Sequence, residues 1–246
     1  MTSPDPVASM PRWGAAHRDA KGRAIFATML SAIGPTVANE SWLDVGCGSG
    51  GIAAELSKHV ASVVGIDPEA WPGWPDLMSS NPGLRLLQRD CRAIESVVPN
   101  GSIGVAVCNQ VYEHVPDVPA LLTELFKALK PGGHCYFAGP NLLWPIEPHV
   151  FYPFVHWLPR ERAIRMLSKM GLHRMRELDA WSMHYWTLRS HLRAAGFEVS
   201  SLLAERMLAS RRRAPNAALL RVLKFLAVAT EPVAPSFVFL LRKPTT

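Results

Sequence analysis

The stretch Leu43-Asp44-Val45-Gly46-Cys47-Gly48-Ser49-Gly50-Gly51 decides the fold of this 246-residue chain. The apolar run at its start is typical of a short buried strand, and the spacing of apolar residues over 52–59 predicts a helix. Glycines between a strand and a helix let a ligand approach the backbone, and the helix N-terminus offers free N–H groups to it. The stretch therefore predicts a ligand-binding turn. Two alternatives stay open: the GxGxxG pattern of dinucleotide sites, which Gly46, Gly48 and Gly51 satisfy, and a turn that only tightens packing.

Short apolar runs alternate with helical patterns on either side of this turn. Polar residues end the runs at 63–66, 84–88 and 103–108, namely Asp67, Asp90 and Asn109. A helix is expected at 118–129, where Lys130-Pro131-Gly132-Gly133 stops it, and a fifth strand at 135–139. This order predicts an α/β fold of the doubly wound, Rossmann-like type, with a mostly parallel sheet and its ligands at the carboxyl ends of the strands.

Three aspartates mark these strands. Asp44 lies inside a buried strand, where an unpaired carboxylate is costly, so it should face a polar or cationic group. Asp67 follows 23 residues later, the separation at which an acidic side chain accepts hydrogen bonds from both ribose hydroxyls. Asp90, together with the backbone N–H of Cys91, could bind the edge of an adenine. Each aspartate taken alone can also be a helix N-cap.

The composition indicates a folded protein with an uneven charge. Hydrophobic residues make up 48% of the chain and charged residues 19%, which excludes general disorder. Residues 1–159 hold 10 Lys/Arg and 14 Asp/Glu, whereas residues 160–246 hold 16 and 6. A basic half can contact an anionic partner, but no RNA-binding module is recognisable, which argues against a nucleic-acid substrate.

Targeting and redox signals are absent from the sequence. No secretory or organellar address is visible, and charges and prolines break the apolar stretch 214–238. The cysteines lie singly, without metal-ligand or disulfide spacing. We therefore expect a cytoplasmic protein with reduced thiols and no metal site, able to lie at a membrane surface.

The regular alternation breaks after the fifth strand. Residues 140–185, called the insertion below, are rich in Pro and aromatic residues, including Trp144, Phe151, Tyr152, Phe154, Trp157, Trp181, Tyr185 and Trp186, and contain a basic helix at 160–170. A long insertion at this place usually covers a site, so its aromatic residues either bind substrate or form its own small core. The pattern then resumes with a helix at 188–195, a strand at 197–203, a basic helix at 215–229 and a strand at 237–241. We expect an N-terminal helical cap over 1–40 and one domain over 41–246.

Five motifs together resemble one family: LDVGCGSG at 43–50, GIDPE at 65–69, QRDC at 88–91, NQVYEHVPD at 109–117 and LKPGG at 129–133. In this combination the chain resembles the class I S-adenosylmethionine-dependent methyltransferases, and within them the small-molecule methyltransferase type 11 family. The resemblance implies a seven-stranded sheet whose last strand, 237–241, is reversed. One departure is Trp71-Pro72-Gly73-Trp74-Pro75, which replaces the usual helix start beside the adenosine pocket.

The resemblance also implies roles for individual residues. Asp44 and the backbone of Gly46, Cys47 and Gly48 would hold the methionyl end of the cofactor, and Asp67 its ribose. Asp90 and the Cys91 amide would bind adenine. Asn109 and Gln110 would lie near the sulfonium, with His114 at the methyl-transfer face.

Methyl transfer from a sulfonium is an in-line displacement, so alignment and exclusion of water can suffice. If the acceptor is a hydroxyl, a neutral histidine could take its proton, and His114 and His149 are the candidates, with His184 a further one. Each can equally be a cap or a structural residue. The expected reaction is methylation of a hydroxyl on a sugar, glycolipid or natural product. The alternatives are an NAD(P)-dependent oxidoreductase and a catalytically silent cofactor-binding protein.

The basic C-terminal helix, 215–229, has two interpretations. With Arg211-Arg212-Arg213 before it, the helix could lie on an anionic membrane surface. The simpler expectation is a helix that packs its apolar side on the sheet and shows its charges to water.

Overall fold

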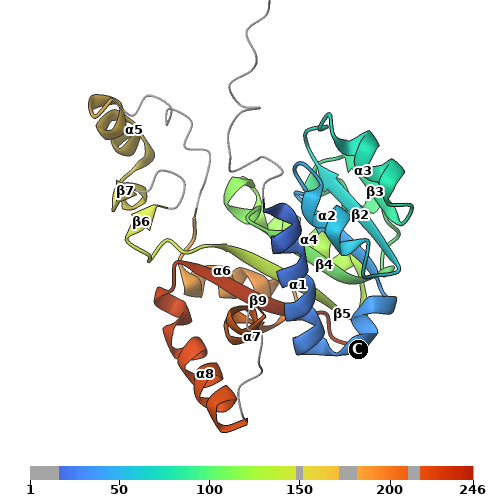
Figure 1. Cartoon of the computed structure of the whole chain (residues 1–246). Helices are drawn as coiled ribbons and strands as arrows, with labels where there is room; N and C mark the ends of the chain where they lie inside the picture. Colours follow the sequence, from blue (N-terminus) through green and yellow to red (C-terminus); the bar gives the residue numbers. More distant parts are fainter. Residues whose placement is uncertain (1–16, 148–151, 172–181, 210–216, 246) are drawn as a thin grey trace, which may run out of the picture.

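The computed structural model describes residues 17–147, 152–171, 182–209 and 217–245. One sheet has seven strands in the order β3-β2-β1-β4-β5-β9-β8 (Figure 1). Their bounds are β1 Ser41–Val45, β2 Ser62–Asp67, β3 Leu84–Gln88, β4 Ile103–Asn109, β5 Leu129–Pro140, β8 Glu198–Ser201 and β9 Ser236–Arg242. Only β9 runs antiparallel to its neighbours β5 and β8. The mostly parallel sheet with a reversed last strand is confirmed.

Helices cover both faces of the sheet. The α-helices are α1 Arg18–Ile33, α2 Gly51–Leu56, α3 Trp74–Ser80, α4 Val118–Ala128, α5 Arg160–Lys169, α6 Tyr185–Ala194, α7 Leu203–Leu208 and α8 Ala217–Thr230. Short 3-10 turns are η2 Pro35–Asn39, η3 Cys91–Ser96, η4 Tyr112–His114, η5 Val155–Trp157 and η7 Glu231–Val233. No helix in the described ranges is long and apolar enough to cross a membrane.

Several predicted bounds differ from the structure. The strand expected over 197–203 is β8, which ends at Ser201 and is followed by α7. As an edge strand, β8 pairs only with β9, and the last residue pair between them is Ser201 with Phe239. In the other direction, β5 begins at Leu129, and its Pro-Gly-Gly segment runs on into the strand instead of forming a separate turn. The helix expected at 52–59 ends at Leu56.

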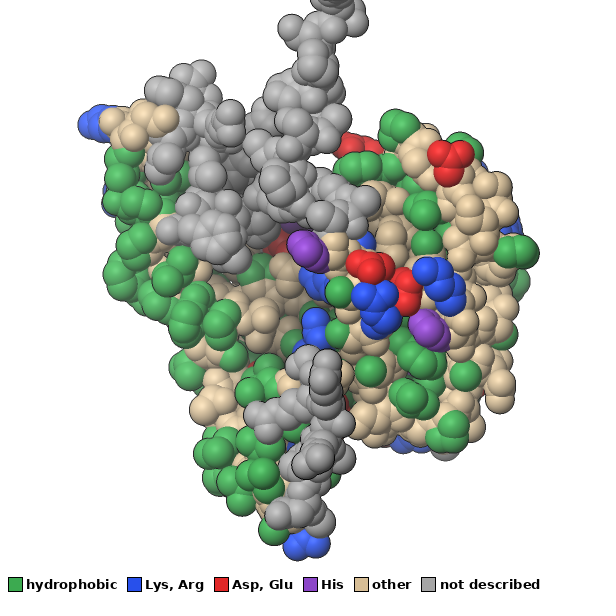
Figure 2. Space-filling model, in the orientation of Figure 1, with side chains coloured by type: hydrophobic (Ala, Val, Ile, Leu, Met, Phe, Trp, Pro, Cys, Tyr) green, Lys and Arg blue, Asp and Glu red, His purple; other side chains and the backbone are tan. Residues whose placement is uncertain are grey.

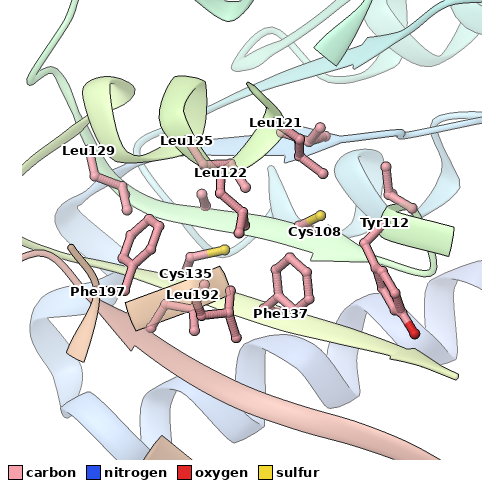
Figure 3. Packing of buried hydrophobic residues seen from close by; sticks show 14 of the residues in the cluster. Cys108, Tyr112, Leu121, Leu122, Leu125, Leu129, Cys135, Phe137, Leu192 and Phe197 are labelled. Carbon is pink, nitrogen blue, oxygen red and sulfur yellow. The ribbon is translucent and has the colours of Figure 1, made fainter. Parts of the chain in front are cut away.

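Alternate side chains of each strand enter two different cores. Leu43 and Val45 pack with α4 and α6 in one cluster, part of which Figure 3 shows. Trp42 and Val63 pack on the other face against residues of α1 and α2, including Ile25. The all-buried strand β4 contributes to both clusters, as expected for a central parallel strand.

The same alternation shows on which face of the sheet the polar residues of the strands lie. Asp44 is two residues from Trp42, and Asp67 has the same parity as Val63. Asn109 likewise has the parity of Val107, which belongs to the α1 side. Because strand side chains alternate with period two, all three polar side chains lie on the face of the sheet that α1 covers.

Residues 146–147 and 152–169 of the insertion form a lobe set off from the sheet (Figure 1). Strands β6 Ile146–Glu147 and β7 Tyr152–Pro153 pair antiparallel, and η5 and α5 follow them. Val155, Ala163 and Leu167 are buried together as a small core of this lobe. Of the aromatic residues named for the insertion, Tyr152 packs against this core, in agreement with the alternative that they form a core of their own.

Candidate functional site

The glycine turn after β1 is held open by backbone conformation. Gly46 and Gly48 have φ of 68° and 51°, values that side-chain-bearing residues rarely adopt. The N–H groups of Gly46 and Cys47 both donate to the carbonyl of Ile66, at 2.8 and 3.0 Å. A Cβ at Gly46 would lie 2.5 Å from Val111, whereas one at Gly48 would meet nothing within 4 Å. The turn therefore packs tightly on one side and leaves space on the other.

Asp67 fixes the position of this turn from the end of β2. Its carboxylate accepts hydrogen bonds from the N–H of Gly48 at 2.8 Å and from that of Glu69 at 3.1 Å. The indole of Trp74 donates to the Gly48 carbonyl at 2.9 Å. The unusual Trp-Pro stretch thus starts α3 at Trp74 and supplies a wall of the turn, a role that the sequence pattern left undefined.

Asp44 is the most unusual group in the site. The side chain is buried, and its Oδ2 has no hydrogen-bond partner within the described part of the chain. Burial raises the pKa of Asp44 to about 7; the charge of Asp67 adds to this, and Arg18 and Lys21 oppose it. A buried carboxylate oxygen without a hydrogen-bond partner is costly, so this position is suited to a ligand that donates hydrogen bonds to Oδ2.

Two cations of α1, Arg18 and Lys21, lie near this carboxylate, and Arg206 of α7 lies near Lys21. The sequence patterns did not single them out. Burial and the charges of Arg18 and Arg206 lower the pKa of Lys21, while the carboxylates of Glu113 and Asp44 oppose that shift. Arg18 and Lys21 lie one turn apart on α1, a spacing that could have indicated a shared face. Arg206 was unpredictable because α7 itself was not expected.

The end of β4 adds an amide. Asn109 is buried, and its Nδ2 has no partner among the residues that the structure describes. Gln110 follows with φ of 59°, and its N–H donates to the carbonyl of Ala138 at 2.7 Å. His114 ends the short turn η4 just beyond. The structure thus brings Asn109 to the same sheet face as Asp44, as the strand pattern predicts.

Other predicted residues have structural partners or lie elsewhere. Asp90 caps η3 and accepts hydrogen bonds from the backbone and the guanidinium of Arg92, which hold its pKa at about 2. The adenine contact of Asp90 and Cys91 remains a prediction. His184 caps α6 by accepting from the N–H of Thr187. His149 lies outside the described residues.

Tyr112 ties the two ends of the insertion together. Its hydroxyl donates to the carbonyl of Pro140, and it accepts from the N–H of Met183 at 3.1 Å. The N–H of Leu142 also donates to the Met183 carbonyl at 3.1 Å. Tyr112 is fully buried, so this link is shielded from water and orients the insertion relative to β4.

We expect Tyr112→Phe to loosen the insertion without changing cofactor binding. The substitution leaves the Pro140 carbonyl and the Met183 N–H without this partner, which costs about 1–3 kcal/mol of unfolding free energy. Proteolysis within 140–185 should become faster, and the KM for the methyl acceptor should rise. Calorimetry with S-adenosylhomocysteine is the control; a large loss of that affinity would contradict a role limited to the insertion.

These features fit S-adenosylmethionine. The Oδ2 of Asp44, which has no hydrogen-bond partner among the described residues, could accept from its ammonium, the open side of Gly48 would give it space, and Asp67 stands at the strand end where a ribose would lie. Within the described ranges, no cluster of three His, Cys, Asp or Glu could hold a metal ion. The fold and site define the class of Rossmann-like, S-adenosylmethionine-dependent methyltransferases.

Comparison with known proteins agrees. A family model of a methyltransferase domain matches residues 16–202, more than half of the chain. The ubiquinone biosynthesis O-methyltransferase of Pseudomonas entomophila is 27% identical over 68% of this chain and 68% of its own length. That of Idiomarina loihiensis is 34% identical, over 40% of this chain and only 42% of its own length. The chain therefore belongs to the methyltransferase domain family and to class I of the S-adenosylmethionine-dependent enzymes.

Solved structures show the same fold. The 1,6-didemethyltoxoflavin-N1-methyltransferase of Burkholderia thailandensis, which holds S-adenosylhomocysteine, has a TM-score of 0.56 and 15% identity, covering 95% of this chain and 81% of that one. A methyltransferase from Mesorhizobium loti has a TM-score of 0.54 and 17% identity, covering 89% of this chain and 100% of that one. At such identities the likeness concerns the fold alone.

Proposed function

We propose that the protein methylates a hydroxyl oxygen on a small or lipid-linked acceptor. The observation that carries the cofactor half of this proposal is the buried Asp44 carboxylate beside the open glycine turn. The choice of oxygen is supported by the relatives named as ubiquinone biosynthesis O-methyltransferases. Those names favour an intermediate of quinone biosynthesis over the sugar or glycolipid acceptor expected from the sequence.

Asp44, Asp67 and the cations of α1 would hold the cofactor. Asp44, once ionised, would accept hydrogen bonds from the ammonium group of the cofactor. Arg18 or Lys21 would pair with the carboxylate of the cofactor. Asp67 accepts from its ribose hydroxyls with lone pairs that Gly48 and Glu69 leave free. When bound, the cofactor supplies a methyl group on a positively charged sulfur. The chain itself contributes alignment and a site shielded from water.

The acceptor would approach from the insertion side. Trp157, Trp186 and Phe154 remain more than half exposed, whereas the small core of the lobe uses other residues. Exposed aromatic rings can bind flat or apolar ligands. We infer that at least one of these three aromatic side chains contacts the acceptor and that the others cover the lobe from solvent.

His114→Ala should slow methylation of a hydroxyl acceptor about 100-fold at neutral pH, because general-base catalysis contributes roughly 100- to 10,000-fold. Raising the pH should recover part of the rate as the acceptor ionises without help. His149→Ala tests the second candidate in the same assay. His59→Ala is the control, because this histidine follows α2, where it contacts Glu55 and stacks on Phe26. Full turnover by both His114→Ala and His149→Ala, at unchanged cofactor affinity, would exclude a histidine base.

A labelled-methyl assay tests the proposed function directly. The protein is incubated with labelled S-adenosylmethionine and matched panels of phenols, quinone precursors, sugars and glycolipids. Transfer to a phenol or quinone precursor is expected. Binding of S-adenosylhomocysteine without transfer to any acceptor would favour the silent cofactor-binding protein, and binding of NAD(P) in its place would favour an oxidoreductase.

A further inference from the structure

Helix α8 exposes apolar side chains on the side that faces away from the protein. Leu220, Leu223 and Ala227 are the partly or fully buried positions of the helix. On the opposite side, Phe225 is 72% exposed and Val222 53% exposed. Leu226 and Val228 flank them and are about as exposed as Val222. Hydrophobic side chains gather over this part of the surface at the lower left of Figure 2.

This arrangement corrects the simpler expectation for the C-terminal helix. A surface helix that packs on a sheet normally turns a polar side to water, and a helix that is apolar all round is normally buried. In α8 the exposed side is mostly apolar; Arg221 lies on it between Phe225 and Val228, and Lys224 lies at its edge. Packing on the domain therefore accounts for only one face of the helix.

The contact between α8 and the domain is also loose. An apolar groove of about 160 Å³ lies between α7 and α8. It is lined by Ala204, Met207, Leu208, Leu223, Leu226, Ala227 and Thr230. Because Leu226 belongs both to the groove and to the exposed face, the two apolar surfaces are continuous.

The two charged side chains of α8 are both basic. They are Arg221 and Lys224. Lys224 pairs with Glu205 of α7 at 2.7 Å, and Arg221 is exposed on the mostly apolar side. Two copies meeting through α8 would bring these like charges together, which opposes association. An anionic lipid surface would instead attract them.

We propose that α8 lies in the interface of an anionic membrane. Phe225 and Val222 enter the apolar layer, and Arg221 contacts lipid phosphates. The helix would lie along the surface, a placement that suits its 14 residues. The proposal concerns binding alone and does not depend on the identity of the methyl acceptor.

Vesicle flotation of the full-length protein tests this. Vesicles of phosphatidylcholine with about 30% phosphatidylglycerol supply the anionic surface, and vesicles of phosphatidylcholine alone are the comparison. The wild type should float with the anionic vesicles, and less so as salt rises from about 0.1 M to about 0.5 M. The double variant Val222→Ser/Phe225→Ser should lower the partition coefficient at least about 10-fold, because two exposed apolar side chains no longer enter the lipid.

Matched variants and a second measurement keep the test decisive. Leu30→Ser removes an exposed leucine from α1 and should leave flotation unchanged. Arg221→Gln should reduce the preference for anionic vesicles. The affinity for S-adenosylhomocysteine should stay within about twofold in every variant, which shows that the fold is intact. Equal flotation of the double variant and the wild type, or no flotation of the wild type, overturns the proposal. A concentration-dependent dimer that the double variant abolishes, without flotation, would assign the face to a second copy.

Discussion

Asp44→Asn is expected to weaken S-adenosylmethionine binding about 10- to 100-fold, the largest single effect on the cofactor site. A hydrogen bond to a charged group contributes about 1.5–3 kcal/mol, and each 1.4 kcal/mol or so is a factor of ten in affinity. Asparagine keeps the size of the side chain but cannot offer a full negative charge to the ammonium. Titration calorimetry at about pH 8, where Asp44 is ionised in the wild type, measures the difference.

The same variant should remove a pH dependence. Because burial raises the pKa of Asp44 from 3.8 to about 7, the free protein holds this carboxyl protonated below neutrality. The cationic cofactor needs it ionised, so wild-type affinity should rise with pH up to about 7, by as much as about tenfold per pH unit, and then level off. The Asn variant should show a flatter profile.

Linkage gives the corresponding effect on stability. A carboxyl whose folded pKa is raised binds more protons in the native state than in the unfolded state. Without cofactor, the contribution of Asp44 to stability therefore falls as the pH rises from 3.8 towards about 7. Burial also raises the pKa of Glu231 to about 7, so the informative quantity is the difference between wild type and Asn variant. Asp76→Asn, an exposed position on α3, is the control. Equal affinity of Asp44→Asn and wild type at about pH 8 would contradict the assignment.

Gly46→Ala is expected to lower the unfolding free energy by about 2–5 kcal/mol. Two costs combine: about 1–2 kcal/mol for a side chain at positive φ, and about 1–3 kcal/mol for forcing a methyl group against packed neighbours. The added Cβ would lie 2.5 Å from Val111. Denaturant unfolding of the cofactor-free protein measures the change.

Gly48→Ala should behave differently although it lies two residues away. Its φ of 51° carries the conformational cost alone, because no atom lies within 4 Å of the added Cβ. The methyl group would instead occupy the space beside the turn and lower cofactor affinity. Gly101→Ala is a matched control, with φ of 72° and the same open surroundings in a distant turn. It should cost similar stability and leave affinity unchanged. Equal stability losses at Gly46 and Gly48 would rule out the packing argument.

The predictions that the structure confirms depend on local patterns. The glycine turn, the polar residues at the strand ends and the order of strands follow from neighbours in sequence and from the period of two along each strand. Asp44 is the clearest instance, since a carboxylate within an apolar run already required a polar environment, and the structure places Arg18 and Lys21 near it. The predicted bounds are wrong where pairing between strands sets the length of a strand. An example is β8, whose length depends on its single neighbour β9.

The sequence by itself determined the alternation of strands and helices, the position of the glycine turn and which strand ends carry polar groups, because these depend on short-range periodicity and on glycine's access to positive φ. Only the tertiary structure decided which cations lie near Asp44, that Tyr112 joins the two ends of the insertion, and that α8 leaves an apolar face exposed. Those properties depend on contacts between segments far apart in the chain. Such contacts are set by how the helices and strands pack, which local sequence patterns do not predict.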